Sequence, residues 1–163
     1  MATKHQQMQR IIHQFKYETG KKEVDMHDVV KWAIAHGWPL PTPADPLERL
    51  AQEFSRAARE EIRHDEATGK PYRANHAIVV MRDDKQSAWW FDIDEDPPRE
   101  KMLRALVQRR EQMVGDGVQL ALDADHWNST HLKDEPIQLS FDFSLDVEWG
   151  KNSLDQDGEK KTG

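Results

Sequence analysis

The spacing of apolar residues changes along the chain, and this change restricts the fold more than any other feature of the sequence. In residues 3–62, apolar side chains recur every three or four positions, which is the period of an amphipathic helix. From Ile137 to Trp149 they alternate strictly with polar residues, which is the period of a half-buried strand. Because both periods are present, we expect an α+β protein.

Two helices are predicted before residue 40. The first runs from about Thr3 to Glu18 and is stopped by Gly20. The second begins after Asp25, whose carboxylate can accept the first backbone N–H groups of a helix. It ends before Gly37, because glycine readily adopts the left-handed conformation that closes a helix.

A third helix has the clearest start signal of the chain. Asp45 stands at the cap position, Pro46 at the first helical position and Glu48 three residues after the cap. Its apolar face comprises Leu47, Leu50, Ala51, Phe54, Ala58 and Ile62. The opposite side carries a polar and basic stripe that comprises Arg49, Gln52, Arg56, Arg59 and Arg63.

The stripe has two interpretations. Glu53, Glu60 and Glu61 are close enough in sequence to pair with its arginines, in which case it is a solvated helix face. If the protein's own carboxylates leave the guanidinium groups unpaired, the stripe is a binding surface for an anionic partner.

A β-hairpin follows the third helix. Ala74–Met81 and Ser87–Ile93 are rich in β-branched and aromatic residues, and the five polar residues 82–86 separate them. Asp96, Pro97 and Pro98 then open a long fourth helix. Whether this helix continues through Gly115 and Gly117 is open, since two glycines in a helix interior cost roughly 2 kcal/mol.

We therefore expect one α+β domain over residues 3–149, with a helical N-terminal half, a hairpin, a long fourth helix and a C-terminal strand. Residues 150–163 offer no apolar face and are expected to be a disordered tail.

The net charge differs between the two parts of the chain. Residues 1–91 hold 14 Lys and Arg against 13 Asp and Glu, whereas residues 92–163 hold 9 against 17. All the excess acidity therefore lies in the C-terminal part, which includes an acidic helix and strand region over residues 94–149.

The order helix, helix, capped helix, hairpin over residues 3–93 resembles that of a winged-helix domain. The resemblance implies that the third helix enters the DNA major groove and that the hairpin contacts the backbone. On this basis the expected nucleic-acid-binding residues are Arg49, Gln52, Ser55, Arg56, Arg59, Arg63, Arg82 and Lys85. The stretch Ala58–His76 also resembles small uncharacterised bacterial proteins, some from mobile elements. We therefore expect a cytoplasmic, bacterial or phage-related protein that binds duplex DNA and regulates transcription.

The alternative function is that of a protein–protein adaptor or inhibitor that uses its acidic C-terminal half. Residues 138–143, Gln-Leu-Ser-Phe-Asp-Phe, resemble the short peptides that bind the bacterial sliding clamp. In such peptides the glutamine anchors one end and apolar side chains fill a groove, which implies partner-binding roles for Gln138, Leu139, Phe141 and Phe143. The same residues also fit a strand of the protein's own sheet, or an exposed edge that pairs with a partner.

The sequence contains few residue patterns that are typical of catalytic or metal sites. The chain has no cysteine, which excludes disulfides, thiolate metal sites and cysteine nucleophiles. Phe91-Asp92-Ile93-Asp94 and the later Gly115-Asp116-Gly117 resemble phosphotransfer motifs of haloacid dehalogenases, but about 20 residues between them are too few for that fold. Asp123, Asp125, His126 and His131 are weak metal ligands by spacing. We expect no enzymatic activity, cofactor, metal or membrane contact, and homodimerisation remains open.

Overall fold

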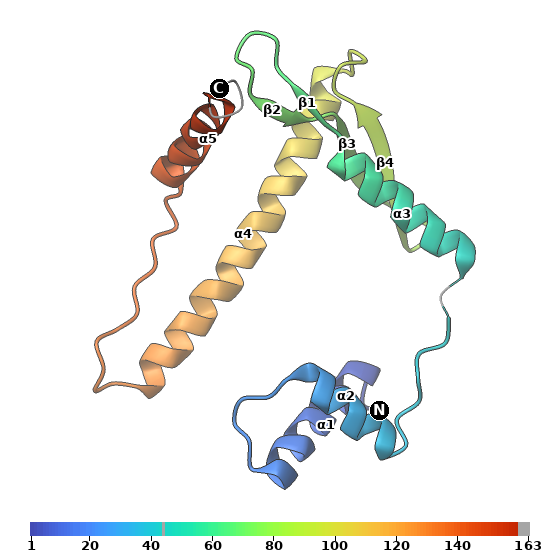
Figure 1. Ribbon diagram of the computed structural model, residues 1–163, viewed down its shortest axis with the longest axis vertical. Coiled ribbons are helices and arrows are strands. Elements are labelled where there is room, and N and C mark those ends of the chain that lie inside the picture. The colour runs from blue at the N-terminus through green and yellow to red at the C-terminus, as the bar shows by residue number, and fades with distance from the viewer. Residues whose placement is uncertain (44, 160–163) are drawn as a thin grey trace. The chain divides into compact units, whose positions relative to one another are not determined.

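The structure is a computed structural model that describes residues 1–43 and 45–159, and it divides into two compact units, Met1–Arg49 and Leu50–Gly163. Helices and strands are both present, which confirms the α+β class (Figure 1). Within the described residues the elements are α1 Lys4–Thr19, α2 Met26–Ala35, α3 Pro46–Glu60, β1 Ile62–His64, β2 Pro71–Arg73, β3 Asn75–Arg82, β4 Lys85–Asp92, α4 Arg99–Thr130 and α5 Ser144–Glu159.

The first unit is a pair of capped helices. Thr3 caps α1, because its hydroxyl accepts the Gln6 amide at 3.2 Å while the Thr3 amide donates to the Gln6 side chain at 2.8 Å. Gly20 ends the helix with a φ of 69°. Asp25 caps α2 by accepting the His27 amide at 2.8 Å. These boundaries lie within about one residue of those predicted.

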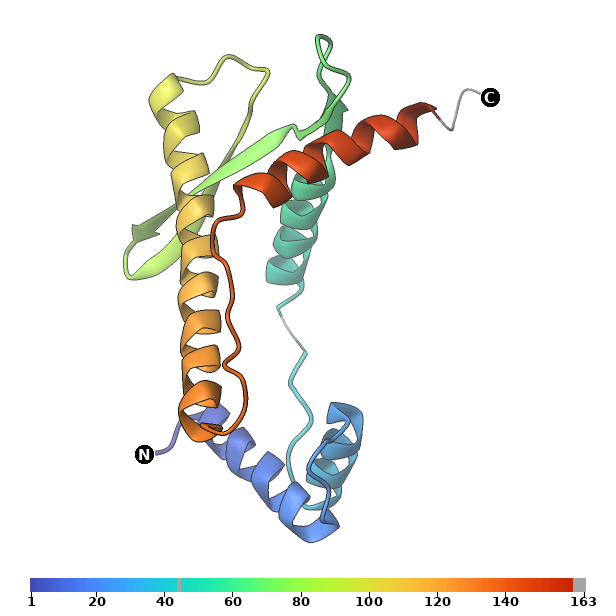
Figure 2. The same cartoon turned by 90° about the vertical axis from the view of Figure 1, so that its left-hand side faces the viewer.

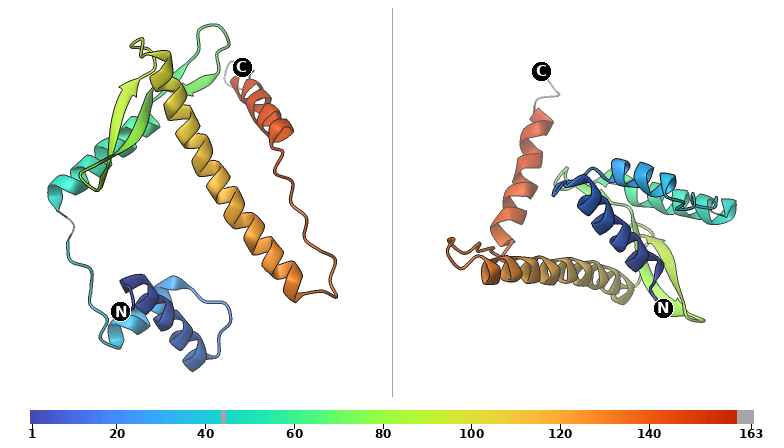
Figure 3. Two further views of the ribbon diagram at one scale, coloured as in Figure 1. Left: turned by 180° about the vertical axis from the view of Figure 1, so that it is seen from behind. Right: turned by 90° about the horizontal axis from the view of Figure 1, so that it is seen from below.

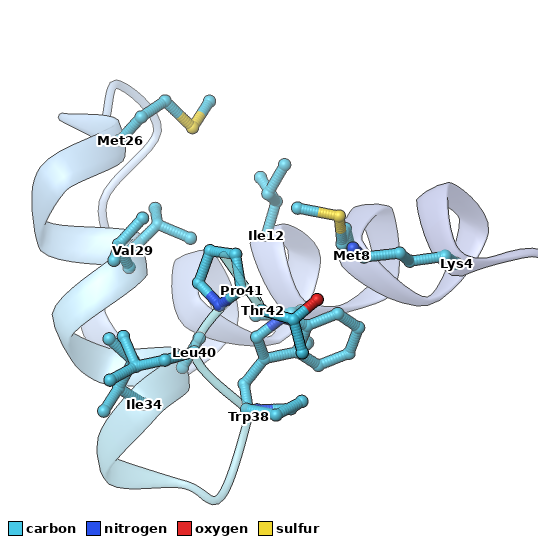
Figure 4. Close-up of a pocket in the computed structure, with 14 residues that line it drawn as sticks. Lys4, Met8, Ile12, Met26, Val29, Ile34, Trp38, Leu40, Pro41 and Thr42 are labelled. Atoms are coloured by element: carbon cyan, nitrogen blue, oxygen red, sulfur yellow. The ribbon is translucent and has the colours of Figure 1, made fainter. Parts of the chain in front are cut away.

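The end of α2 also follows the prediction. Gly37 has a φ of 94°, and the amide of Trp38 donates to the carbonyl of Ala33 at 2.9 Å, which completes a Schellman motif. Beside it, α1, α2 and residues 38–42 line an apolar cavity of about 550 Å³ (Figure 4). Lys4 is the charged residue at its rim, and the other lining side chains include Met8, Ile12, Val29, Ile34 and Trp38.

The second unit is organised by the antiparallel hairpin β3–β4 and by α4, which packs on β3. Its buried apolar residues are Ala74, Ile78 and Ala105. The predicted hairpin is confirmed, but its predicted five-residue connection is wrong. Two residues, Asp83 and Asp84, make the turn with φ values of 50° and 59°. This is the type I′ geometry, and aspartate tolerates the left-handed region well enough to replace the glycine usual there.

A second, shorter hairpin precedes it. β1 pairs with β2 in an antiparallel register, and the six residues between them close around Asp65 and Gly69. The Asp65 side chain accepts the amides of Ala67 and Thr68 at 2.9 and 3.0 Å. The sequence does not predict these two strands, because three residues are too few to show a period.

Helix α4 is continuous from Arg99 to Thr130, so both glycines lie inside it. Figure 3 shows the β3–β4 hairpin against the first half of α4, while the second half extends away from it. Packing on β3 therefore stabilises the N-terminal half directly, and the helix continues from there through Gly115 and Gly117.

The predicted C-terminal strand is wrong. Residues 137–143 are irregular and belong to no sheet, and Ser144–Glu159 form α5. The Ser144 amide donates to the Asp142 carboxylate at 3.1 Å, which favours a helix start where the alternating pattern predicts a strand. The predicted disorder of the tail is also wrong for residues 150–159, which lie in α5, and residues 160–163 are outside the described part.

Candidate nucleic-acid interface and extended segment

Helix α3 carries most of the residues predicted to bind DNA. Asp45 caps it by accepting the Leu47 amide at 3.0 Å, as the sequence indicates. No residue of the helix is buried, and even Leu47 and Phe54 on its apolar side are 76% and 69% exposed. Arg49, Gln52, Arg56 and Arg59 stand on its other side at the spacing of one helix face, with Ser55 at the edge.

The arginines of α3 differ in their surroundings. Within the described residues, neither Arg49 nor Arg56 makes an ion pair or a hydrogen bond through its guanidinium. Arg59 lies over the Trp90 ring of β4, with its central carbon 5.4 Å from the ring centroid. Arg59 is thus held against the sheet, whereas Arg49 and Arg56 face solvent.

Arg63 does not belong to this stripe, because α3 ends at Glu60 and Arg63 lies on β1. Its guanidinium donates to both carboxylate oxygens of Asp92 at 2.8 and 2.7 Å. It also donates to Asp94 at 2.7 Å and to Glu61 at 3.2 Å. Its predicted place in an unpaired basic row is therefore wrong, since the protein's own carboxylates neutralise it.

This cluster ties the short hairpin to the base of the long one. The Tyr72 hydroxyl donates to Asp94 at 2.8 Å, and the hydrogen bond raises the pKa of Tyr72. The paired guanidinium lowers the pKa of Asp92, and the Asp92 and Asp94 carboxylates raise the pKa of Arg63. Every charged member has an opposite charge, so the arrangement holds β1, β2 and β4 together.

The other two basic residues of the prediction flank the tight turn of β3–β4. Arg82 and Lys85 are register partners immediately before and after Asp83 and Asp84. In Figure 2 this turn lies on one side of α4, whereas α3 lies on the other. The structure therefore does not bring Arg82 and Lys85 together with the arginines of α3 in one surface.

The predicted partner-binding residues lie on the extended segment, residues 137–143, which runs back alongside α4 (Figure 2). Asn128 of α4 holds its start, because the side-chain amide donates to the Ile137 carbonyl and accepts the Ile137 amide, each at 2.9 Å. Further along, Phe141 lies over Gly117, where an added Cβ would stand 3.7 Å from its ring. Leu139, Phe141 and Phe143 stay 44–47% exposed.

Sequence reasoning missed a second carboxamide on the same helix. Gln108 accepts the Val79 amide at 2.9 Å and donates to the Val79 carbonyl at 3.0 Å, on the edge of β3 that β4 leaves unpaired. Neither Gln108 nor Asn128 belongs to a sequence motif that would predict its contact. Their bidentate geometry depends on the tertiary position of the backbone they meet.

The phosphotransfer resemblance finds no site in the structure. Asp92 and Asp94 bind Arg63, and Asp116 lies in the middle of α4 rather than in a loop. Among the side chains that the structure describes, in residues 1–43 and 45–154, no three His, Asp or Glu converge as metal ligands would.

Comparison with other proteins gives no relative: no known protein family, curated protein or solved structure matches this chain. In the described part of the chain, no helix has the length and apolar character needed to cross a membrane.

Proposed function

We propose that this protein is a non-enzymatic DNA-associated regulator that binds duplex DNA through the arginine face of α3. The observation that carries the proposal is that Arg49 and Arg56 project from a well-capped helix without buried residues, with no carboxylate of the described chain bound to them. Guanidinium groups held at helical spacing suit phosphate contacts and bidentate pairing with guanine.

The arginine face, not net charge, supports this function. Helix α3 carries Glu48, Glu53 and Glu60 as well as three arginines, so its formal charge is zero. Arg59 is available only if its contact with Trp90 opens or if it binds DNA from that position. Arg49 and Arg56 are therefore the two side chains on which binding should depend most.

The test is duplex binding by the full chain at several salt concentrations. Two to three phosphate contacts predict a slope of roughly −2 to −3 in a plot of log affinity against log salt. Arg56→Glu should abolish binding. Arg10→Glu, on α1, changes the net charge equally and should leave binding intact. Equal losses in both variants would show that only overall charge matters, and unchanged binding by Arg56→Glu would reject α3 as the interface.

The extended segment supports a second candidate, an adaptor that binds a protein through Gln138–Phe143. The strand of its own sheet, which is the competing interpretation of these residues, does not form. A peptide that is extended, outside any sheet and half-exposed is suited to a groove on a partner.

Purified bacterial sliding clamp is the partner to test first, because the segment resembles clamp-binding peptides. Gln138→Ala and Leu139→Ala should each weaken binding at least roughly tenfold, by analogy with anchor residues of other interfaces. Ser140→Ala, between the proposed anchors, should have little effect. If the full chain and a peptide of residues 136–144 both fail to bind the clamp, this candidate is wrong.

A further inference from the structure

Helix α4 carries an apolar row that the described residues of its unit leave about half exposed. Leu106, Met113, Leu120 and Trp127 recur at intervals of seven residues. Their side chains are 46%, 63%, 48% and 46% exposed, and Trp127 stays so although it stacks on His131. A seven-residue apolar repeat maintained through a helix supplies one of the two apolar positions of a heptad that form a coiled-coil seam.

The two known contacts of α4 lie to either side of this seam. The hairpin reaches the helix at Ala105 and Gln108, positions that face away from the seam in a heptad. The extended segment covers Gly117 and contacts Asn128, and its Phe141 and Phe143 also line a groove with Met113 of the row. The row between them stays about half exposed from Leu106 to Trp127, over a length of about 32 Å.

The charges of α4 indicate which partner fits. Residues 99–111 carry five Lys and Arg against two Glu, whereas residues 112–130 carry three Asp and no Lys or Arg. One half of the helix is therefore basic and the other acidic. A second α4 in the antiparallel direction would place each basic half beside an acidic half, whereas a parallel one would oppose like charges.

Arg109 points to the same arrangement. It stands beside the seam, and its counterparts seven and fourteen residues later are Asp116 and Asp123. Within the described residues it makes no ion pair, and its charged neighbour is Arg73; burial and this like charge lower its pKa. An acidic side chain from outside the chain would stabilise it.

We propose that α4 forms an antiparallel coiled coil with α4 of a second copy of this chain, through Leu106, Met113, Leu120 and Trp127. The interface is isologous, so Arg109 of each copy faces Asp116 and Asp123 of the other. The proposal is independent of DNA binding and of the adaptor role.

Sedimentation of the full chain tests the interface. At about 100 μM the wild-type protein should sediment as a dimer, and Leu120→Glu should raise its dissociation constant at least tenfold. Leu122→Glu is the matched control, because Leu122 lies off the seam and is 56% exposed. Both leucines are exposed within the chain, so both variants should keep the wild-type circular dichroism. A wild-type monomer, or equal effects of the two variants, would overturn the proposal.

Orientation is tested separately, because the chain has no cysteine of its own. In an antiparallel dimer centred near residue 115, two copies of Met113→Cys are about 6 Å apart along the axis, and two copies of Leu103→Cys about 36 Å. A short bismaleimide should therefore cross-link the first variant and not the second. Efficient cross-linking of both would show a parallel pair. Arg109→Glu should weaken the dimer, and adding Asp123→Arg should restore it, which a parallel pair would not allow.

Discussion

Two stretches of this protein have β-type sequences, yet only one of them becomes a strand. Asn75–Arg82 pairs with Lys85–Asp92 across a two-residue turn, whereas residues 137–143 lie beside α4 without any strand partner. In both cases a carboxamide of α4 meets the extended backbone, Gln108 at Val79 and Asn128 at Ile137. Alternation thus indicates an extended chain with one apolar side, and a nearby complementary strand decides whether a sheet forms.

The largest loss of thermal stability is expected at the base of the β3–β4 hairpin. Arg63→Ala leaves Asp92 and Asp94 without their cation and separates β1 from β4. The Tm of the second unit should fall by roughly 5 °C, while protease sensitivity of residues 137–143 stays unchanged. Thermal melting and limited proteolysis measure the two. Arg56→Ala, which breaks no contact, is the control. An equal Tm in both variants would mean that the cluster contributes nothing to the hairpin.

The two carboxamides allow the direct comparison. Gln108→Ala leaves the Val79 amide and carbonyl unpaired at a sheet edge and should cost about 1 kcal/mol of global stability. Asn128→Ala should cost less globally but increase hydrogen exchange at Ile137, because no sheet holds that segment. Hydrogen exchange read by mass spectrometry distinguishes the two. Protection of Ile137 that survives in Asn128→Ala would show that apolar contacts alone hold the segment.

The same comparison explains which parts of the fold could be predicted from sequence. Helix caps are local, so Asp25 and Asp45 predict their helices within about a residue. The β3–β4 hairpin is also local, since its strands are adjacent in sequence. The C-terminal strand fails because its pattern depends on a distant partner that the fold does not provide. Likewise α4 survives two glycines because its first half packs on β3, which no local pattern reveals.

The candidate site divides in the same way. Arg49, Gln52, Arg56 and Arg59 follow from helical spacing alone, and the structure places them on one face. By its position in the sequence Arg63 continues that spacing, but the helix ends three residues earlier. Asp92 and Asp94, about 30 residues away in sequence, bind its guanidinium. Long-range ion pairs leave no periodic signal, so the sequence cannot separate an unpaired arginine from a neutralised one.

A smaller loss of stability, which arises in the β3–β4 hairpin, is expected in mild acid. His76 of β3 is 6% exposed, and burial lowers its pKa below the ordinary value of 6.5. The unfolded chain therefore binds the proton more readily, so stability is complete above pH 6.5 and declines as the pH falls below it. Arg73 and Arg109 oppose the charged ring, while Asp92 favours it.

His76→Leu should remove this decline, so that the Tm difference between variant and wild type shifts in the variant's favour from pH 7.5 to 5.5. Asp92 does not interfere, because its lowered pKa confines its loss of stability to pH values below about 3.8. Parallel curves for the two proteins across this range would contradict the assignment.

The smallest effect is a gain in stability, and it concerns the contact of residues 137–143 with α4. An alanine Cβ at position 117 would meet Phe141 at 3.7 Å, an ordinary van der Waals distance, and at position 115 it would meet no atom within 4 Å. Gly115→Ala should therefore gain roughly 0.5–1 kcal/mol from helix propensity alone, and Gly117→Ala slightly more because it adds a contact with the phenyl ring. Urea unfolding of both variants, with and without Phe141→Ala, isolates that contact. If the advantage of Gly117→Ala persists without the phenyl ring, the extended segment does not pack on α4 at this point, and Asn128 alone would hold it there.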